Sequence, residues 1–176
     1  MSPELMQLRI RLTEITYCED VSLHLRMLEV LRAKTDHSIH IAETEYDLSR
    51  FTCIVHAFEL IEDPQYLEIA GFGLGQIFAG PEFVHFLLEN KLLEESSDSQ
   101  VSEGDIIIYF NAGRVTHAGK VSGEGRVLSK WGVGLLLDHC IFETPEQYGN
   151  DIRYFKSVDN DDAYDKFTKY AQSKGL

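Results

Sequence analysis

Residues 104–130 read GDIIIYFNAGRVTHAGKVSGEGRVLSK, and this stretch decides the fold class. The apolar run at 106–110 predicts a buried strand, and two further runs at 115–121 and 126–130 predict the strands that follow it. A short Asn-Ala-Gly turn precedes the second strand, and Ser122–Gly125 has the composition of a hairpin turn before the third. The stretch therefore predicts a central antiparallel sheet.

Outside this stretch the pattern is mostly helical. Helix-start residues followed by apolar residues at helical spacing predict helices after Ser2, Asp20, Asp47 or Ser49, Gly80 and Asp159. The third of these is predicted to run over 51–61 and to stop before Pro64, and the fourth over 81–95. One further strand is predicted at 151–156. Helices followed by an antiparallel sheet make an α+β class.

The composition is that of one globular domain. The chain has 176 residues, of which 44% are hydrophobic and 26% charged. A formal net charge of -13 repels phosphate backbones and anionic lipids, so we expect no nucleic-acid partner and no membrane. No apolar stretch approaches the roughly 20 residues of a spanning helix, and the N-terminus lacks a secretory signal. The sequence therefore predicts a cytoplasmic protein and leaves open both its oligomeric state and export by a route without a signal.

Of the three cysteines, Cys53 has the predicted position that most favours a reactive thiol. The three cysteines, Cys18, Cys53 and Cys140, have spacings that suggest neither a disulfide framework nor a zinc pair. Cys53 falls in the first turn of a predicted buried helix, where free N–H groups and the helix dipole lower the pKa of a thiol. His117, on the second predicted strand, supplies a base for such a nucleophile. The alternative is that Cys53 is a small buried core residue.

Two segments of the predicted sheet resemble a known family. Gly104–Phe110 is similar to the Gly-Asp-apolar strand of the NlpC-type papain-like cysteine peptidases and amidases, and Thr116–Val121 is similar to their His-x-Gly strand. The resemblance implies a papain-like domain over 47–176. A shift in periodicity near its start separates this domain from a helical N-terminal extension over 1–46.

The same resemblance implies a cysteine-dependent amide hydrolase. Cys53 takes the place of the nucleophile, His117 that of the general base, and Ser129 that of the third polar residue. Facing side chains on antiparallel strands lie about 5 Å apart, so the Ser129 hydroxyl can bond the imidazole. The family more often has His, Asn or Gln at this third position, and Asp-Cys-Ser-Gly where this chain has Thr-Cys-Ile-Val. The expected substrate is a peptide or another amide, without a cofactor. The alternative is a degenerate, non-catalytic domain that binds a peptide or protein partner.

Three further residues are candidates for substrate contact, namely Lys130, Trp131 and Tyr46. Trp131 is the single tryptophan and has two interpretations. It is either a core anchor before a bend at Gly132 or a wall of a substrate groove. His139 is predicted to face solvent, and the alternative is that it folds back toward the site.

Two other motifs suggest ligand sites only by composition. His37 and His40, with Asp36 and Glu43 nearby, are zinc-binding residue types, but no helical stripe places them on one face. Gly71-x-Gly73-x-Gly75 lacks the strand–turn–helix frame of a dinucleotide site and therefore predicts a loop. We expect no metal.

Overall fold

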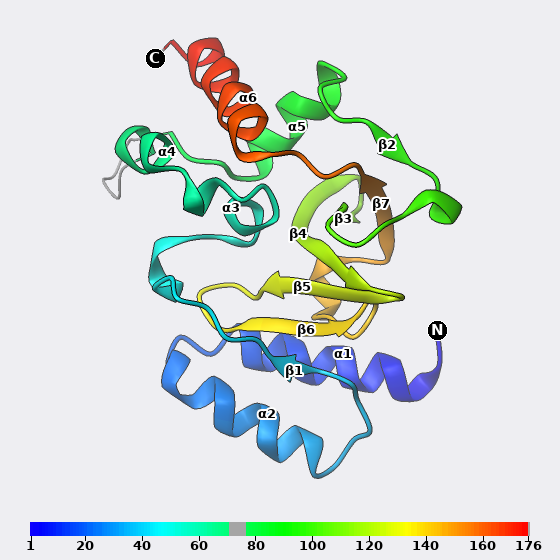
Figure 1. Ribbon diagram of the computed structural model, residues 1–176. Coiled ribbons are helices and arrows are strands. Elements are labelled where there is room, and N and C mark those ends of the chain that lie inside the picture. The colour runs from blue at the N-terminus through cyan, green and yellow to red at the C-terminus, as the bar shows by residue number, and fades with distance from the viewer. Residues whose placement is uncertain (71–76, 176) are drawn as a thin grey trace.

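The computed structural model describes residues 1–70 and 77–175, so the predicted glycine loop at Gly71-x-Gly73-x-Gly75 lies outside the described residues. Helices cover both faces of one antiparallel sheet (Figure 1). The α+β class, with helices first and an antiparallel sheet at the centre, is therefore confirmed.

The sheet formed by the described residues has seven strands in the order β1-β6-β5-β4-β3-β7-β2, and every neighbouring pair is antiparallel. The strands are β1 (His40–Ile41), β2 (Glu95–Ser96), β3 (Ile106–Asn111), β4 (Arg114–Gly123), β5 (Arg126–Lys130), β6 (Leu136–Cys140) and β7 (Asp151–Phe155). The strands predicted from the sequence are β3, β4, β5 and β7. β3 pairs on both sides, with β4 and β7, and its continuous apolar run fits this enclosed position.

Six α-helices surround the sheet in the described residues: α1 (Pro3–Thr16), α2 (His24–Arg32), α3 (Cys53–Ala57), α4 (Pro64–Ile69), α5 (Pro81–Glu89) and α6 (Asn160–Ser173). Short 3-10 turns lie between them: η1 (Val21–Leu23), η2 (Leu48–Arg50), η3 (Leu60–Glu62), η4 (Asp98–Gln100) and η5 (Glu146–Tyr148). Among the described residues no helix is both long enough and apolar enough to span a bilayer.

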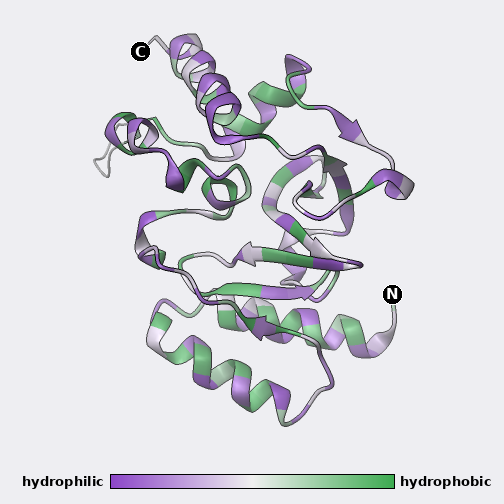
Figure 2. Ribbon diagram, in the orientation of Figure 1, coloured by the Kyte–Doolittle hydropathy of each residue, from purple (hydrophilic) through white to green (hydrophobic). Residues whose placement is uncertain are grey.

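Alternation along β3 divides the interior into two cores. Ile106 and Ile108 belong to a core that includes residues of α3, α5 and α6, whereas Ile107 and Tyr109 belong to a core that includes residues of α1 and α2. Figure 2 shows hydrophobic residues recurring along α1, α2 and the neighbouring strands. Both faces of the sheet are therefore covered.

Residues 1–46 take part in this packing. The Ser2 hydroxyl accepts a hydrogen bond from the Leu5 N–H at 3.2 Å, which begins α1 where the sequence predicts it. Leu8 and Leu12 of α1 are buried in the second core, and β1 pairs with β6 at the edge of the sheet. The predicted extension thus covers one face and supplies an edge strand.

Two predicted helices are shorter than expected. The helix predicted over 51–61 is interrupted at Glu59, whose φ of 56° is left-handed, and the chain continues as η3 and α4. The helix predicted over 81–95 ends at Glu89, just before Lys91, which has a φ of 54°. In both places the apolar residues keep a helical spacing beyond the point where the backbone leaves the helix, so the spacing alone cannot show where the helix ends.

Candidate active site

Cys53 is the first residue of α3, and this short helix holds it against the sheet. Thr52 precedes the helix in an extended conformation, and its hydroxyl accepts a hydrogen bond from the Val55 N–H at 3.3 Å. Ile54 and Val55 are buried in the core between α3 and β4. Cys53 therefore lies half-buried beside β4.

The Cys53 sulfur faces polar groups from several parts of the chain. The backbone N–H groups of Ala118 and Ile54 donate to it, and the Lys130 ammonium and Tyr148 phenol interact with its charge. Burial nevertheless raises the pKa of the Cys53 thiol. The expectation of a lowered thiol pKa is therefore wrong, because desolvation outweighs the dipole of a helix only five residues long.

His117 lies on β4 immediately before Ala118, and its ring is fixed by stacking. The ring lies parallel to that of Tyr148, with centroids 3.9 Å apart and an interplanar angle of 9°. His117 Nε2 lies 2.9 Å from the Ser129 hydroxyl, so the predicted contact is present. His117 Nδ1 is buried and has no hydrogen-bond partner within the described part of the chain.

The Ser129 hydroxyl also contacts two rings, those of His139, for which a place near the site is only the alternative prediction, and of Trp131. His139 Nε2 lies 2.8 Å from Ser129 Oγ, and the Trp131 Nε1–H donates to the same oxygen at 3.1 Å. None of the four residues His117, Ser129, Trp131 and His139 is more than 2% exposed. One hydroxyl therefore joins three ring nitrogens in a buried network.

The donors and acceptors in this network can be assigned from its geometry. His139 Nδ1 lies 2.9 Å from the Cys140 carbonyl, which can only accept, so Nδ1 carries the proton and Nε2 is bare. The Ser129 hydroxyl proton then goes to His139 Nε2. Ser129 Oγ accepts from Trp131, and its remaining lone pair accepts from His117 Nε2–H. We therefore assign His117 Nδ1 as unprotonated.

Both histidines are neutral in this environment. Burial lowers the pKa of His117 well below its usual value, and the nearby His139 and His56 act in the same direction. Burial lowers the pKa of His139 to about 4. The imidazole of His117 therefore presents a free lone pair at neutral pH.

Gly119 allows β4 and β5 to approach closely at this point. A Cβ at Gly119 would lie 2.6 Å from Val127 Cγ1, 2.8 Å from Ser129 Cβ and 2.9 Å from the Leu128 carbonyl oxygen. The two strands could not approach this closely with any larger residue. The glycine two positions after His117 thus helps to bring Ser129 to the imidazole.

His139 corrects one sequence expectation. It is fully buried rather than facing solvent, because residues 136–140 form the strand β6, which the sequence analysis did not predict. The run of three leucines before Asp138 is the sequence feature that indicates this strand. His139 shares a sheet face with Leu137, two positions earlier, and Leu137 belongs to the second core.

The three predicted substrate contacts lie in different environments. Trp131 is 2% exposed and packs edge-on against the rings of His139 and Tyr148, so it is a core anchor and not a groove wall. Tyr46 is half-buried and lines a separate cavity of about 760 Å³ with His56 and other residues. Lys130 is the one of the three that lines the cavity next to Thr52.

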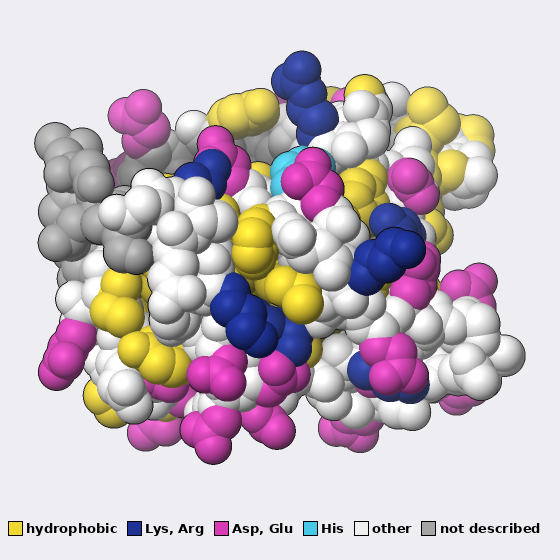
Figure 3. Space-filling view, turned by 90° about the horizontal axis from the view of Figure 1, so that it is seen from above, with side chains coloured by type: hydrophobic (Ala, Val, Ile, Leu, Met, Phe, Trp, Pro, Cys, Tyr) yellow, Lys and Arg dark blue, Asp and Glu magenta, His cyan; other side chains and the backbone are white. Residues whose placement is uncertain are grey.

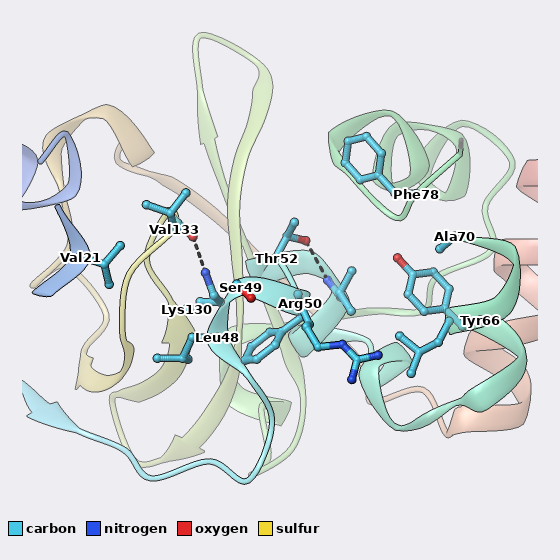
Figure 4. Close-up of a pocket in the computed structure, with 14 residues that line it drawn as sticks. Val21, Leu48, Ser49, Arg50, Thr52, Tyr66, Ala70, Phe78, Lys130 and Val133 are labelled. Atoms are coloured by element: carbon cyan, nitrogen blue, oxygen red, sulfur yellow. Dashed lines mark hydrogen bonds between the residues drawn. The ribbon is translucent and has the colours of Figure 1, made fainter. Parts of the chain in front are cut away.

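This cavity of about 470 Å³ lies between η2, α3 and the end of β5 (Figure 4). Thr52 and Val55 line it from α3 and its cap, and Lys130 lines it from β5. Lys130 Nζ donates to the Gly132 carbonyl at 2.6 Å. The cavity is therefore lined by the residue that precedes Cys53, although not by Cys53 itself, and it has a buried amine in its wall.

The histidine-rich segment shows no metal geometry. Nowhere in residues 1–70 and 77–175 do three or more His, Cys, Asp or Glu side chains form a group that could hold a metal ion. His37 Nδ1 instead accepts the Ile39 N–H at 3.3 Å, and Glu143 accepts the Ser38 N–H at 3.0 Å.

Comparison with known proteins gives one match. Residues 74–156 match the family model of a domain of unknown function, DUF7689. The matched region contains His117, Ser129 and His139 and begins after Cys53. No curated protein and no solved structure matches the chain. The description of this family gives no activity.

Proposed function

We propose that this chain is a cysteine-dependent amide hydrolase with a papain-like fold of the NlpC type, in which Cys53 is the nucleophile and His117 the general base. The observation that carries the proposal is His117 Nδ1, which is buried, is assigned as unprotonated and has no hydrogen-bond partner in the described residues, the Cys53 thiol included. The N–H of the next residue, Ala118, donates to the Cys53 sulfur. Tyr148 stacks on His117 and also interacts with the charge of Cys53.

The proposed reaction starts from a neutral thiol and a neutral imidazole. His117 Nδ1 takes the thiol proton as the Cys53 sulfur bonds to the amide carbonyl carbon. The N–H groups of Cys53 and Ile54, which lie at the sulfur, stabilise the resulting oxyanion. The C–N bond then breaks, and the imidazolium gives its proton to the leaving amine. Water, deprotonated by the same nitrogen, hydrolyses the thioester to a carboxylic acid and restores the thiol.

Ser129 determines how well this base works. Its oxygen accepts the His117 Nε2–H, which keeps Nδ1 free and fixes the ring. A hydroxyl carries no charge, so it stabilises an imidazolium less than a carboxylate does. We therefore expect slow turnover.

Hydrolysis of a panel of chromogenic amino-acid anilides tests the proposal. Wild-type protein should release the aniline, and Cys53→Ala or His117→Ala should lower the rate by about 1,000-fold or more. Cys18→Ala is the matched control, because Cys18 lies between α1 and η1, outside the site, and should leave the rate unchanged. Undiminished hydrolysis by Cys53→Ala would refute the nucleophile.

A second candidate is a non-catalytic domain that binds a peptide or a protein partner. The raised pKa of the Cys53 thiol and the lowered pKa of His117 favour it, because neither group is charged at neutral pH. Iodoacetamide at near-neutral pH discriminates between the two. Labelling of Cys53 that depends on His117 supports the hydrolase, and an inert Cys53 beside labelled Cys18 supports the binding domain.

A further inference from the structure

The cavity next to Cys53 differs in charge from the rest of this acidic chain. Of the 14 residues that line it, none is Asp or Glu, although the chain contains 29 acidic residues. Two of the lining residues, Arg50 and Lys130, are basic. An anionic group therefore meets opposite charge at this cavity and like charge over most of the surface.

Lys130 provides the strongest evidence for the kind of ligand. The residue is 1% exposed, and its ammonium has three N–H bonds, of which the Gly132 carbonyl accepts one. The Phe51 ring lies 5.7 Å from Lys130 Nζ. Lys130 forms no ion pair with any residue that the structure describes. A buried ammonium without a counter-ion is costly, and a ligand carboxylate would satisfy it.

The rest of the wall is apolar. Leu48, Phe51, Val55 and Tyr66 surround the cavity, and Val133 stands at its edge with 61% of its surface exposed. Figure 4 shows Leu48 and Val133 on one side of the space, near Lys130, and Tyr66 on the other. A volume of about 470 Å³ lies in the usual range for small-molecule sites, roughly 300–1,000 Å³.

We propose that this cavity binds an apolar amino-acid residue through its free carboxylate, with Lys130 as the counter-ion and the aliphatic and aromatic wall around the side chain. The inference rests on the proposed function only where it identifies a substrate: if the chain is an amide hydrolase, its substrate is an amide formed by the amino group of such a residue. Two sources share this chemistry, an N-acyl amino acid and the C-terminal residue of a short peptide.

Binding to the Cys53→Ala protein tests the site without turnover. By titration calorimetry, N-acetyl-L-phenylalanine should bind about tenfold or more tightly than N-acetyl-L-phenylalaninamide, which is neutral and otherwise matched. Adding Lys130→Met should remove this preference, and Lys34→Met, an exposed lysine on another face, should keep it. Val133→Trp, at the exposed edge, should weaken both ligands. The peptide Ala-Ala-Phe, compared with its C-terminal amide, shows which source is preferred.

Several outcomes would overturn the site. Equal affinity for the acid and the amide, or no binding of either at about 10 mM, removes the carboxylate recognition. If the Lys130→Met protein still prefers the acid, a residue other than Lys130 recognises the carboxylate, and the proposed counter-ion is wrong. Preferred binding of the acid by Cys53→Ala, together with no hydrolysis of N-acetyl-L-phenylalanine, of Ala-Ala-Phe or of the anilides by wild-type protein, rejects the hydrolase and leaves the ligand site standing.

Discussion

Ser129 makes three hydrogen bonds through one oxygen, and each partner constrains the others. The Trp131 N–H must donate, and His139 Nε2 must accept because its other nitrogen faces a carbonyl. These two bonds use the hydroxyl proton and one lone pair, so His117 can bond only as a donor from Nε2. The protonation state of the proposed base is thus determined by residues that never meet a substrate.

This arrangement predicts the effect of Ser129→Ala. The substitution leaves three buried ring nitrogens without a partner, which should destabilise the fold by about 2–4 kcal/mol. It also frees the His117 tautomer, so any amide hydrolysis should fall by about tenfold or more. Urea unfolding and anilide hydrolysis measure the two effects. Ser99→Ala, at an exposed serine, is the control that should change neither. Unchanged stability of Ser129→Ala would refute the network.

The sequence could identify part of this site and not the rest. The contact between His117 and Ser129 is predictable in outline because a hairpin brings β4 and β5 together, but the register places Ser129 beside Gly119, so it reaches His117 diagonally. His139 reaches the same hydroxyl only through β6, which pairs with β5 after the connection 131–135, and this connection lacks the two-residue turn that fixes a register most plainly. The raised pKa of the Cys53 thiol could not be predicted from the sequence either, because it depends on burial by residues far from Cys53 in the chain.

At the scale of elements, η5 links α1 to the site. The Arg9 guanidinium donates to the Gly149 carbonyl at 2.6 Å, and Thr13 contacts Gln147 at 2.5 Å. From the sheet, the Thr116 hydroxyl donates to the Tyr148 carbonyl at 2.6 Å. Tyr148, held between these contacts, is the residue that stacks on His117. Residues predicted as an N-terminal extension thus support the proposed base indirectly.

The link predicts unequal effects of two substitutions two residues apart on α1. Arg9 is 1% exposed, and Arg9→Met leaves buried carbonyls unpaired, so it should destabilise the fold by about 2 kcal/mol. Arg11 pairs with Glu14 at the surface, and Arg11→Met should cost less than about 0.5 kcal/mol. Urea unfolding gives both values. Similar losses for the two variants would contradict a role of α1 in holding η5.

At the scale of the whole molecule, charged carboxylates lie at the surface and neutral histidines lie in the interior. The aspartates at the start of α6, such as Asp161 and Asp162, are exposed. Figure 3, which looks onto the side of the molecule that carries α6 and β2, shows acidic side chains gathered along one edge and hydrophobic ones nearer the centre. The neutral histidines lie in the interior instead. The molecule therefore keeps these buried imidazoles uncharged while its surface is strongly negative.

Burial of neutral histidines makes the fold sensitive to acid. Burial lowers the pKa of both His56 and His139 from 6.5 to about 4 in the folded protein. Between these values the unfolded chain binds protons that the folded protein does not bind. The stabilisation is therefore complete above about pH 6.5 and is lost as the pH falls towards 4.

The size of this effect can be measured on a residue outside the proposed catalytic set. By pH 5 each of the two histidines should have cost the fold about 2 kcal/mol relative to pH 7.5. His56 lies on α3, and its Nδ1 has no partner in the described residues, so His56→Gln should fold. Urea unfolding at both pH values should show that this variant loses about 2 kcal/mol less than wild type over the interval. Equal losses would mean that His56 is not a neutral, buried group in the folded protein.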